Sequence, residues 1–154
     1  MNLIYTLDDL FPVELYNDAK IEHPRLFGNY SPDGILKTAK VGSRVTCNPA
    51  PTDTDEDFLL LIDDVLKFQT QVESLGYFLG GSNIPHEDNT LSQDDRFMSF
   101  TKEIDGIYVN LIVTQSLIFF EKFMTATHVA RRLNILNKEH RIVLFQAILY
   151  GNKV

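Results

Sequence analysis

The spacing of apolar and polar residues changes several times along the chain. Apolar residues recur every three or four positions where a helix is expected, whereas shorter alternating or wholly apolar runs are typical of strands. This pattern predicts helices over Thr6–Ile21, Asp64–Leu75, Gln115–Leu133 and Lys138–Tyr150, and strands over Ile35–Val41, Phe58–Ile62, Tyr77–Leu79, Arg96–Ile104 and Ile107–Thr114. We therefore predict an α/β (α+β) fold, a mixed sheet with helices packed on it and two C-terminal helices.

Three local signals sharpen this prediction. The run Phe58–Ile62 is apolar at every position, as expected of a strand that is covered on both faces. Asp63 and Asp64 follow this run, and either of them can cap the next helix. Asp105-Gly106 separates two strand-like runs, and this dipeptide is a strong signal for a two-residue hairpin.

Length and cysteine content indicate one intracellular domain. The chain has 154 residues, and we expect a single domain over residues 1–154. Cys47 is the only cysteine, so no disulfide forms within the chain and a reducing compartment is expected. The first residues lack the basic start of a secretory signal. No apolar stretch approaches the roughly 20 residues that span a bilayer. We expect a cytoplasmic protein with no membrane partner.

The charge balance limits the choice of partner. The formal net charge is −7 at pH 7, whereas binding to phosphate backbones favours a basic surface, so we expect no general DNA binding. A local basic group nevertheless lies on the last two predicted helices and comprises Lys122, Arg131, Arg132, Lys138 and Arg141. These side chains either cover helix surfaces and offset the helix dipoles, or they bind a triphosphate or an acceptor.

Acidic residues gather at the start of the buried run. Residues two apart on a strand point to the same face, roughly 6 to 7 Å apart, so Asp55 and Asp57 share a face and Glu56 points away. Two neighbouring carboxylates repel each other, which raises the pKa of one of them unless a cation lies between them. Ligands that offer only oxygen suit Mg²⁺. The pair therefore predicts a magnesium site.

A glycine-serine pair ends the preceding predicted strand. Gly42-Ser43 can bring backbone N–H groups and a hydroxyl close to a phosphate, and glycine leaves room for that approach. This pair alone is more often a plain turn, but the acids at Asp55 and Asp57 favour the phosphate interpretation. Arg44, the next residue, either contacts the phosphate or forms a surface ion pair.

Other interpretations of these residues remain open. One alternative is that the acids from Asp53 to Asp57 form a solvated charge cluster at a strand start. Asp53, Asp55 and Asp57 also match the first positions of a calcium loop, although Phe58 stands where that loop needs glycine. His128 has apolar neighbours and is expected to be a packed histidine rather than a catalytic base.

The order of these motifs resembles a known superfamily. Gly42-Ser43, a loop, then Asp55-x-Asp57 leading into an apolar strand is similar to the signature of the DNA polymerase beta-like nucleotidyltransferases. More of the chain resembles small, phage-type predicted nucleotidyltransferases, over about two-thirds of its length. The segments that carry this resemblance are Gly42-Ser43-Arg44, Thr54–Ile62, Gly76–Ser82, Val109–Thr114, Ala126–Leu133 and Arg141–Gly151. A phage protein of this kind would act in the host cytoplasm.

The resemblance implies transfer of a nucleoside monophosphate from a nucleoside triphosphate to an acceptor hydroxyl. Gly42 and Ser43, with Arg44 beside them, would bind the phosphates, and Asp55 and Asp57 would be the catalytic ligands of Mg²⁺ or Mn²⁺. The superfamily usually supplies a third carboxylate from a later strand. Asn110 stands in that place here, and it can bind a metal through its carbonyl oxygen but cannot act as a base.

Three functional hypotheses follow. The first is an active metal-dependent nucleotidyltransferase whose acceptor is an RNA, a protein or a small molecule. The second is a catalytically impaired protein of this fold that binds nucleotide or regulates a protein partner, which Asn110 and the small size of the domain favour. The third is an ordinary structural domain without a nucleotide site.

Overall fold

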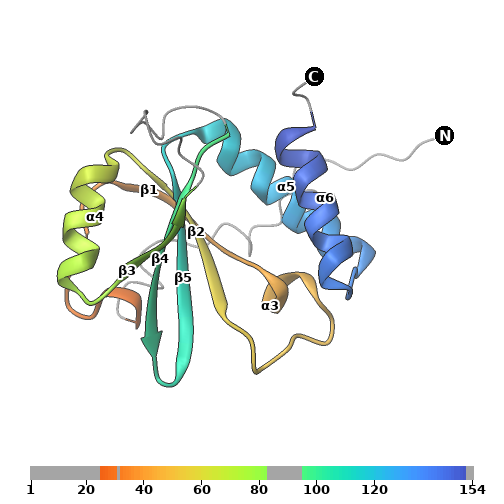
Figure 1. Ribbon diagram of the computed structural model, residues 1–154, viewed down its shortest axis with the longest axis horizontal. Coiled ribbons are helices and arrows are strands. Elements are labelled where there is room, and N and C mark those ends of the chain that lie inside the picture. The colour runs from red at the N-terminus through yellow and green to blue at the C-terminus, as the bar shows by residue number, and fades with distance from the viewer. Residues whose placement is uncertain (1–24, 31, 83–94, 152–154) are drawn as a thin grey trace.

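The computed structural model describes residues 25–30, 32–82 and 95–151 (Figure 1). The predicted helix Thr6–Ile21 lies outside the described residues, as does most of the polar loop expected between residues 82 and 95. In the described ranges, no helix is long and apolar enough to cross a membrane.

Within the part of the chain that the structure describes, five strands form one mixed sheet. Its order is β1-β2-β5-β4-β3, in which β2 and β5 are parallel and every other neighbouring pair is antiparallel. The strands span Ile35–Val41 (β1), Glu56–Ile62 (β2), Phe78–Ser82 (β3), Met98–Ile104 (β4) and Ile107–Thr114 (β5). Together with the two C-terminal helices, this sheet confirms the predicted fold class.

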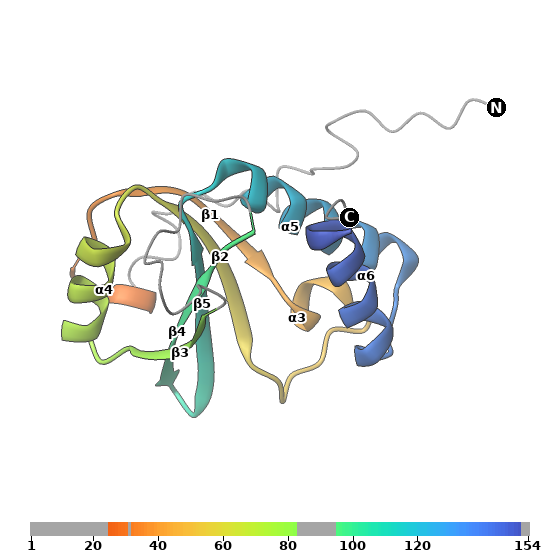
Figure 2. The same ribbon diagram turned by 45° about the horizontal axis from the view of Figure 1, so that its top comes forward.

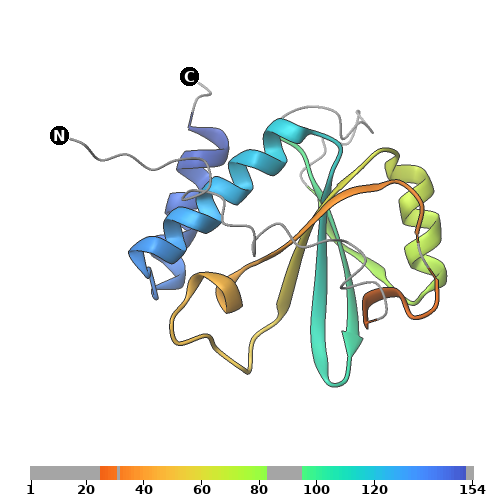
Figure 3. The same ribbon diagram turned by 180° about the vertical axis from the view of Figure 1, so that it is seen from behind.

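Helices cover both faces of the sheet. Helix α4 lies against one face, and α5 and α6 lie on the other side (Figures 1 and 2). The view from behind in Figure 3 shows the same separation and places the short α3 between β1 and the α5–α6 pair. The helices span Ser43–Thr46 (α3), Val65–Ser74 (α4), Leu117–Leu133 (α5) and Lys138–Tyr150 (α6).

The central strand β2 divides the core into two parts. Phe58, Leu60 and Ile62 pack in a cluster with residues of α4, whereas Leu59 and Leu61 pack in a second cluster with residues of β1 and α5. This confirms a strand buried on both faces, which is where a run of five apolar residues is most stable. The Asp57 side chain therefore points to the face that α5 covers, because side chains alternate along a strand.

Element boundaries agree with the predictions in most places. Asp105 and Gly106 both have positive φ, at 53° and 81°, as the predicted two-residue hairpin requires. Asp64, not Asp63, caps α4, because its carboxylate accepts hydrogen bonds from the backbone N–H groups of Leu66 and Lys67 in the first turn of that helix. The connection after β1, expected to be a loop, begins with the one-turn helix α3.

Two strands are longer than the apolar pattern indicated. β2 begins at Glu56, since Glu56 and Asp57 pair along the sheet with β5 even though their side chains are charged. β3 extends through Gly80 and Gly81 to Ser82, because this segment pairs with β4 despite a bulge between Leu79 and Gly81. Backbone pairing, rather than side-chain hydrophobicity, sets these strand ends.

Candidate nucleotide and metal site

Strand register brings the predicted site residues together at one end of the sheet. Asp57 on β2 lies opposite Val41 on β1 and opposite Asn110 on β5. Gly42 directly follows Val41, so the glycine-serine bend is beside Asp57 on one side and Asn110 is beside it on the other. The two acids and the bend thus lie next to each other, as the sequence pattern predicted.

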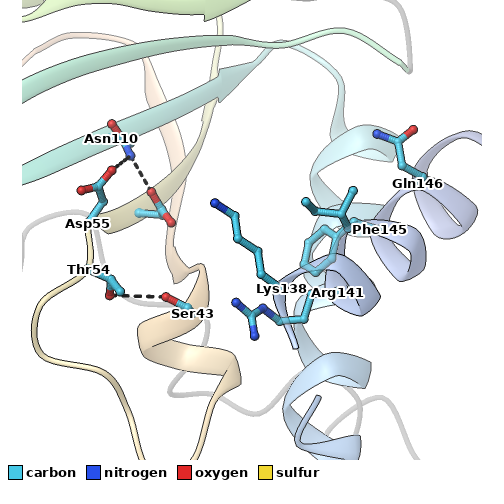
Figure 4. A pocket seen from close by; sticks show the side chains of 10 residues that line it. Ser43, Thr54, Asp55, Asn110, Lys138, Arg141, Phe145 and Gln146 are labelled. Carbon is cyan, nitrogen blue, oxygen red and sulfur yellow. Dashed lines mark hydrogen bonds between the residues drawn. The ribbon is translucent and has the colours of Figure 1, made fainter. Parts of the chain in front are cut away.

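A single amide nitrogen holds both carboxylates. Asn110 Nδ2 donates a hydrogen bond of 2.8 Å to Asp57 Oδ1 and one of 3.3 Å to Asp55 Oδ2 (Figure 4). The amide is oriented from its other end, where Thr101 Oγ1 donates to Asn110 Oδ1 over 2.9 Å. Oxygen atoms of both carboxylates therefore converge on one point, and that point is occupied by a hydrogen-bond donor.

Glycine is required at the bend. Gly42 has φ of 83°, a conformation that L side chains rarely adopt, and a Cβ atom at this position would collide with the carboxylate of Asp57. The chain then turns into α3, where the backbone N–H groups of Val45 and Thr46 donate to the Gly42 carbonyl oxygen. The Ser43 hydroxyl lies 3.4 Å from the hydroxyl of Thr54 in the segment that leads to the acids.

Asp57 is placed where a negative charge is unfavourable. Burial raises the pKa of this half-buried carboxyl above its ordinary value, and the charge of Asp55 adds to the effect. The hydrogen bond from Asn110 and the charge of Arg44 act in the opposite direction without reversing the rise in pKa. A cation between Asp55 and Asp57 would favour the ionised form of Asp57.

The neighbouring Glu56 and Arg44 form their hydrogen bonds outside the carboxylate pair. Glu56 points away, as predicted, and accepts two hydrogen bonds from Arg25, of 2.7 and 2.8 Å. Arg44 donates to the carbonyl oxygens of Thr52 and Thr54 and lies 3.7 Å from a Glu56 carboxylate oxygen. Arg44 therefore stabilises the segment before Asp55. Ser43 lines the pocket described below, whereas Arg44, also predicted to bind nucleotide, does not.

A pocket of about 530 Å³ separates this end of the sheet from α6 (Figure 4). One wall carries the predicted residues, and the other belongs entirely to α6. The lining comprises Ser43, Thr54, Asp55, Asp57 and Asn110 on the sheet side, and Lys138, Arg141, Ile142, Phe145 and Gln146 on the helix side. The pocket is large enough for a small-molecule ligand.

The two walls have opposite charge. Lys138 extends from the start of α6 toward the sheet (Figure 4), and Arg141 lies one turn further along the helix. Arg141 is fixed in place, because its Nη1 donates to the carbonyl oxygens of Ile135 and Leu136 at 3.0 and 2.7 Å. An anion bound beside a cation at the two aspartates would meet both basic side chains. Of the five basic residues grouped by the sequence, these two line the pocket.

The donor set fits a hard divalent cation with few protein ligands. Within the described ranges, no three His, Cys, Asp or Glu side chains gather as a metal-binding group. Two carboxylates with converging oxygens suit Mg²⁺ or Mn²⁺, which retain waters and take further ligands from phosphates. Asn110 would add its carbonyl oxygen only after its amide turned over, and the Thr101 hydroxyl can accept a hydrogen bond from the turned amide as well as donate one.

The sequence did not single out Thr101, which contacts the pocket residue Asn110, nor the pocket residues Phe145 and Gln146. Thr101 acts through Asn110, and this contact depends on pairing between β4 and β5. Phe145 and Gln146 belong to the helix face that starts at Lys138. They follow Ile142 by three and four residues, and this helical spacing was the signal available in the sequence.

His128 is buried in α5, which confirms that it is a packed histidine.

Comparisons with known proteins found no family model, no curated protein and no solved structure that matches this chain.

Proposed function

We propose that this protein is a metal-dependent nucleotidyltransferase that transfers a nucleoside monophosphate from a nucleoside triphosphate to an acceptor hydroxyl. The observation that carries the proposal is the register that sets Asp57 between Gly42 on one neighbouring strand end and Asn110 on the other. The converging carboxylates suit a cation, and the two basic residues across the pocket suit the phosphates that such a cation would accompany.

The proposed arrangement gives each wall of the pocket its own task. Asp55 and Asp57 would hold Mg²⁺ or Mn²⁺. Ser43 lines the pocket next to them and would donate its hydroxyl to a phosphate, at a bend where a Cβ atom on Gly42 would collide with Asp57. Lys138 and Arg141 neutralise the remaining phosphate charge from the opposite wall.

The reaction forms one bond and breaks one. The acceptor oxygen attacks the α-phosphorus, the bond from that phosphorus to the bridging oxygen breaks, and pyrophosphate leaves with the electron pair. When bound, the divalent ion supplies electrostatic stabilisation of the charge on the reacting phosphate. Asn110 cannot accept the acceptor's proton, so that proton passes to water. We therefore expect slow turnover that increases with pH.

Transfer of labelled nucleotide tests this proposal. The protein is incubated with Mg²⁺, an extract that contains acceptors, and each nucleoside triphosphate labelled at the α- or the γ-phosphate. We expect the α-label to become attached to macromolecules or small acceptors, and the γ-label to remain in released pyrophosphate. Asp57→Asn should abolish attachment of the label.

The matched control is Asp53→Asn, because Asp53 lies in the same segment but is exposed and does not line the pocket. This variant should transfer label like the unsubstituted protein. Transfer of the γ-label, or equal transfer by Asp57→Asn, would contradict the proposal.

A second candidate function is nucleotide binding without turnover, in a protein that regulates a protein partner. The contact that favours it is the pair of hydrogen bonds from Asn110 to both carboxylates, since a neutral donor here replaces a potential base. Tight binding of nucleotide with Mg²⁺, no attachment of label, and no gain of transfer in Asn110→Asp would together favour this function over catalysis.

A further inference from the structure

One face of α6 carries three kinds of chemistry in order. Lys138, Arg141, Ile142, Phe145 and Gln146 are spaced by three, one, three and one residues, which places them along a single stripe of the helix. All five line the pocket. The stripe therefore runs from basic side chains through apolar ones to a neutral amide.

Phosphate binding does not account for the second half of this stripe. Ile142 is 50% exposed although it lies on the pocket wall, so a large apolar surface is available to a ligand. The ring of Phe145 packs edge-on against Phe123, with 5.1 Å between the ring centroids, which holds its position. Neither side chain offers a polar atom to a phosphate.

The order of groups on α6 matches the order of groups in a nucleotide. From Lys138 to Gln146 the helix rises by roughly 12 Å, at 1.5 Å per residue. A nucleoside triphosphate whose phosphates lie between the aspartates and Lys138 can extend its sugar and base along that length. An aromatic ring next to an aliphatic side chain suits the flat face of a base, and an amide suits its edge, because it offers both a donor and an acceptor.

We infer that α6 binds the nucleobase of the triphosphate, with Phe145 and Ile142 against the face of the base and Gln146 at its edge. This inference rests on the proposed function, which places a nucleoside triphosphate in the pocket. It adds that α6, the wall opposite the metal ligands, determines which base is accepted.

Comparing each nucleoside triphosphate with inorganic tripolyphosphate tests the inference, because the two ligands share the phosphates and differ by the nucleoside. Binding of both is measured by calorimetry, with Mg²⁺, to the full chain. The unsubstituted protein should bind at least one nucleoside triphosphate about tenfold more tightly than tripolyphosphate, the scale of one stacked base.

Variants of α6 should reduce the difference in affinity between nucleoside triphosphate and tripolyphosphate without weakening the binding of tripolyphosphate. Phe145→Leu should reduce the preference for nucleotide several-fold, and Gln146→Ala should reduce the differences among the four bases. Gln146 is exposed, so its replacement leaves the fold intact even where Phe145→Leu perturbs packing. Val143→Ala is the matched control, since Val143 is on the same helix, 67% exposed and outside the pocket.

The outcomes separate the inference from the function on which it rests. Equal affinity for nucleotide and tripolyphosphate in the unsubstituted protein would overturn the inference while leaving a triphosphate site. A nucleotide preference that neither variant reduces would place the base elsewhere. Binding of neither ligand would refute the proposed function, and the inference with it.

Discussion

Asp57 is the residue at which stability and the proposed function conflict. Its carboxyl is half-buried beside Asp55, and burial raises its pKa, so its ionised form at neutral pH opposes folding when no cation is bound. Asn110 lowers this cost by donating to both carboxylates. A fold without a ligand at this position would be more stable with a neutral residue there, and such local costs are typical of functional sites.

Replacing Asp57 with Asn should therefore stabilise the metal-free protein. In a chelating buffer at neutral pH we expect Asp57→Asn to raise the free energy of unfolding by roughly 1 kcal/mol. A carboxyl whose pKa is raised by folding stabilises the fold at low pH and loses this contribution as the pH rises through its folded pKa. The difference between variant and unsubstituted protein should thus shrink as the pH falls toward 3.8, the ordinary Asp value.

Denaturant titrations at several pH values measure this difference. Asp53→Asn provides the comparison, because Asp53 is exposed and its replacement should change stability little. A clear loss of stability in Asp57→Asn at neutral pH would show that the carboxylate stabilises the metal-free fold.

Asn110 offers a direct gain-of-function test at the residue scale. Asn110→Asp supplies the third carboxylate and removes the amide that bridges the other two, so Mn²⁺ should bind about tenfold more tightly than to the unsubstituted protein. Electron paramagnetic resonance of free Mn²⁺ measures this affinity without any acceptor.

Thr101 is expected to set the amide orientation of Asn110. Thr101→Val should change the Mn²⁺ affinity because it removes the hydroxyl at nearly constant shape. Thr101→Ser keeps a hydroxyl and should have the Mn²⁺ affinity of the unsubstituted protein. Unchanged affinity in both Asn110→Asp and Thr101→Val would separate these residues from the metal site.

At the scale of elements, the turn from β1 into α3 positions the bend against the carboxylates. Gly42→Ala adds both strain at positive φ and a collision with Asp57, whereas Gly106→Ala adds strain alone, since nothing lies within 4 Å of a Cβ there. We expect Gly42→Ala to lower the free energy of unfolding by roughly 1–3 kcal/mol more than Gly106→Ala. Urea titration of both variants checks this, and equal losses would show that the bend is not packed against Asp57.

Most helices and strands could be predicted from the sequence, because hydrophobic spacing and turn residues are local signals. The periodic segment Lys138–Tyr150 and the strand Ile107–Thr114 have the predicted bounds. Strand pairing is not local, so hydrophobic spacing could not show that β2 and β5 are parallel neighbours. The family resemblance indicated only that Asn110 stands in the place of the usual third carboxylate.

The candidate site was predictable on its sheet side, and on the α6 wall only its basic residues Lys138 and Arg141 were singled out. Gly42, Ser43, Asp55 and Asp57 form a recognisable pattern in sequence, and the structure brings them together. The α6 wall depends on how α5 and α6 pack in three dimensions, so the sequence could not indicate that Phe145 and Gln146 share a pocket with the acids.

At the scale of the whole molecule, the two walls of the pocket must be held at a fixed position relative to each other. Asn134, in the turn between α5 and α6, ties that turn to the segment after α3. Its side chain accepts a hydrogen bond of 2.9 Å from the Asn48 backbone N–H and donates one of 3.0 Å to the Asn48 carbonyl oxygen. Its φ of 48° is a left-handed conformation that asparagine tolerates.

Asn134 lies outside the pocket, but removing its hydrogen bonds to Asn48 should weaken the binding of nucleotide in the pocket. Asn134→Gly keeps the left-handed turn but loses both hydrogen bonds, so the free energy of unfolding should fall by roughly 1–3 kcal/mol. Its affinity for nucleotide should fall while its affinity for Mn²⁺ stays unchanged, because the aspartates are on the other wall. Titration of both ligands checks this expectation, and parallel losses would contradict a tie that acts on the α6 wall alone.

The most direct test of the central claim is a calorimetric titration of each nucleoside triphosphate with and without Mg²⁺. Two converging aspartates facing two basic residues predict binding that requires Mg²⁺ in the unsubstituted protein and is lost in Asp55→Asn and Asp57→Asn. Equal binding with and without Mg²⁺, or no binding under either condition, would contradict the assignment of this pocket to a metal–nucleotide complex.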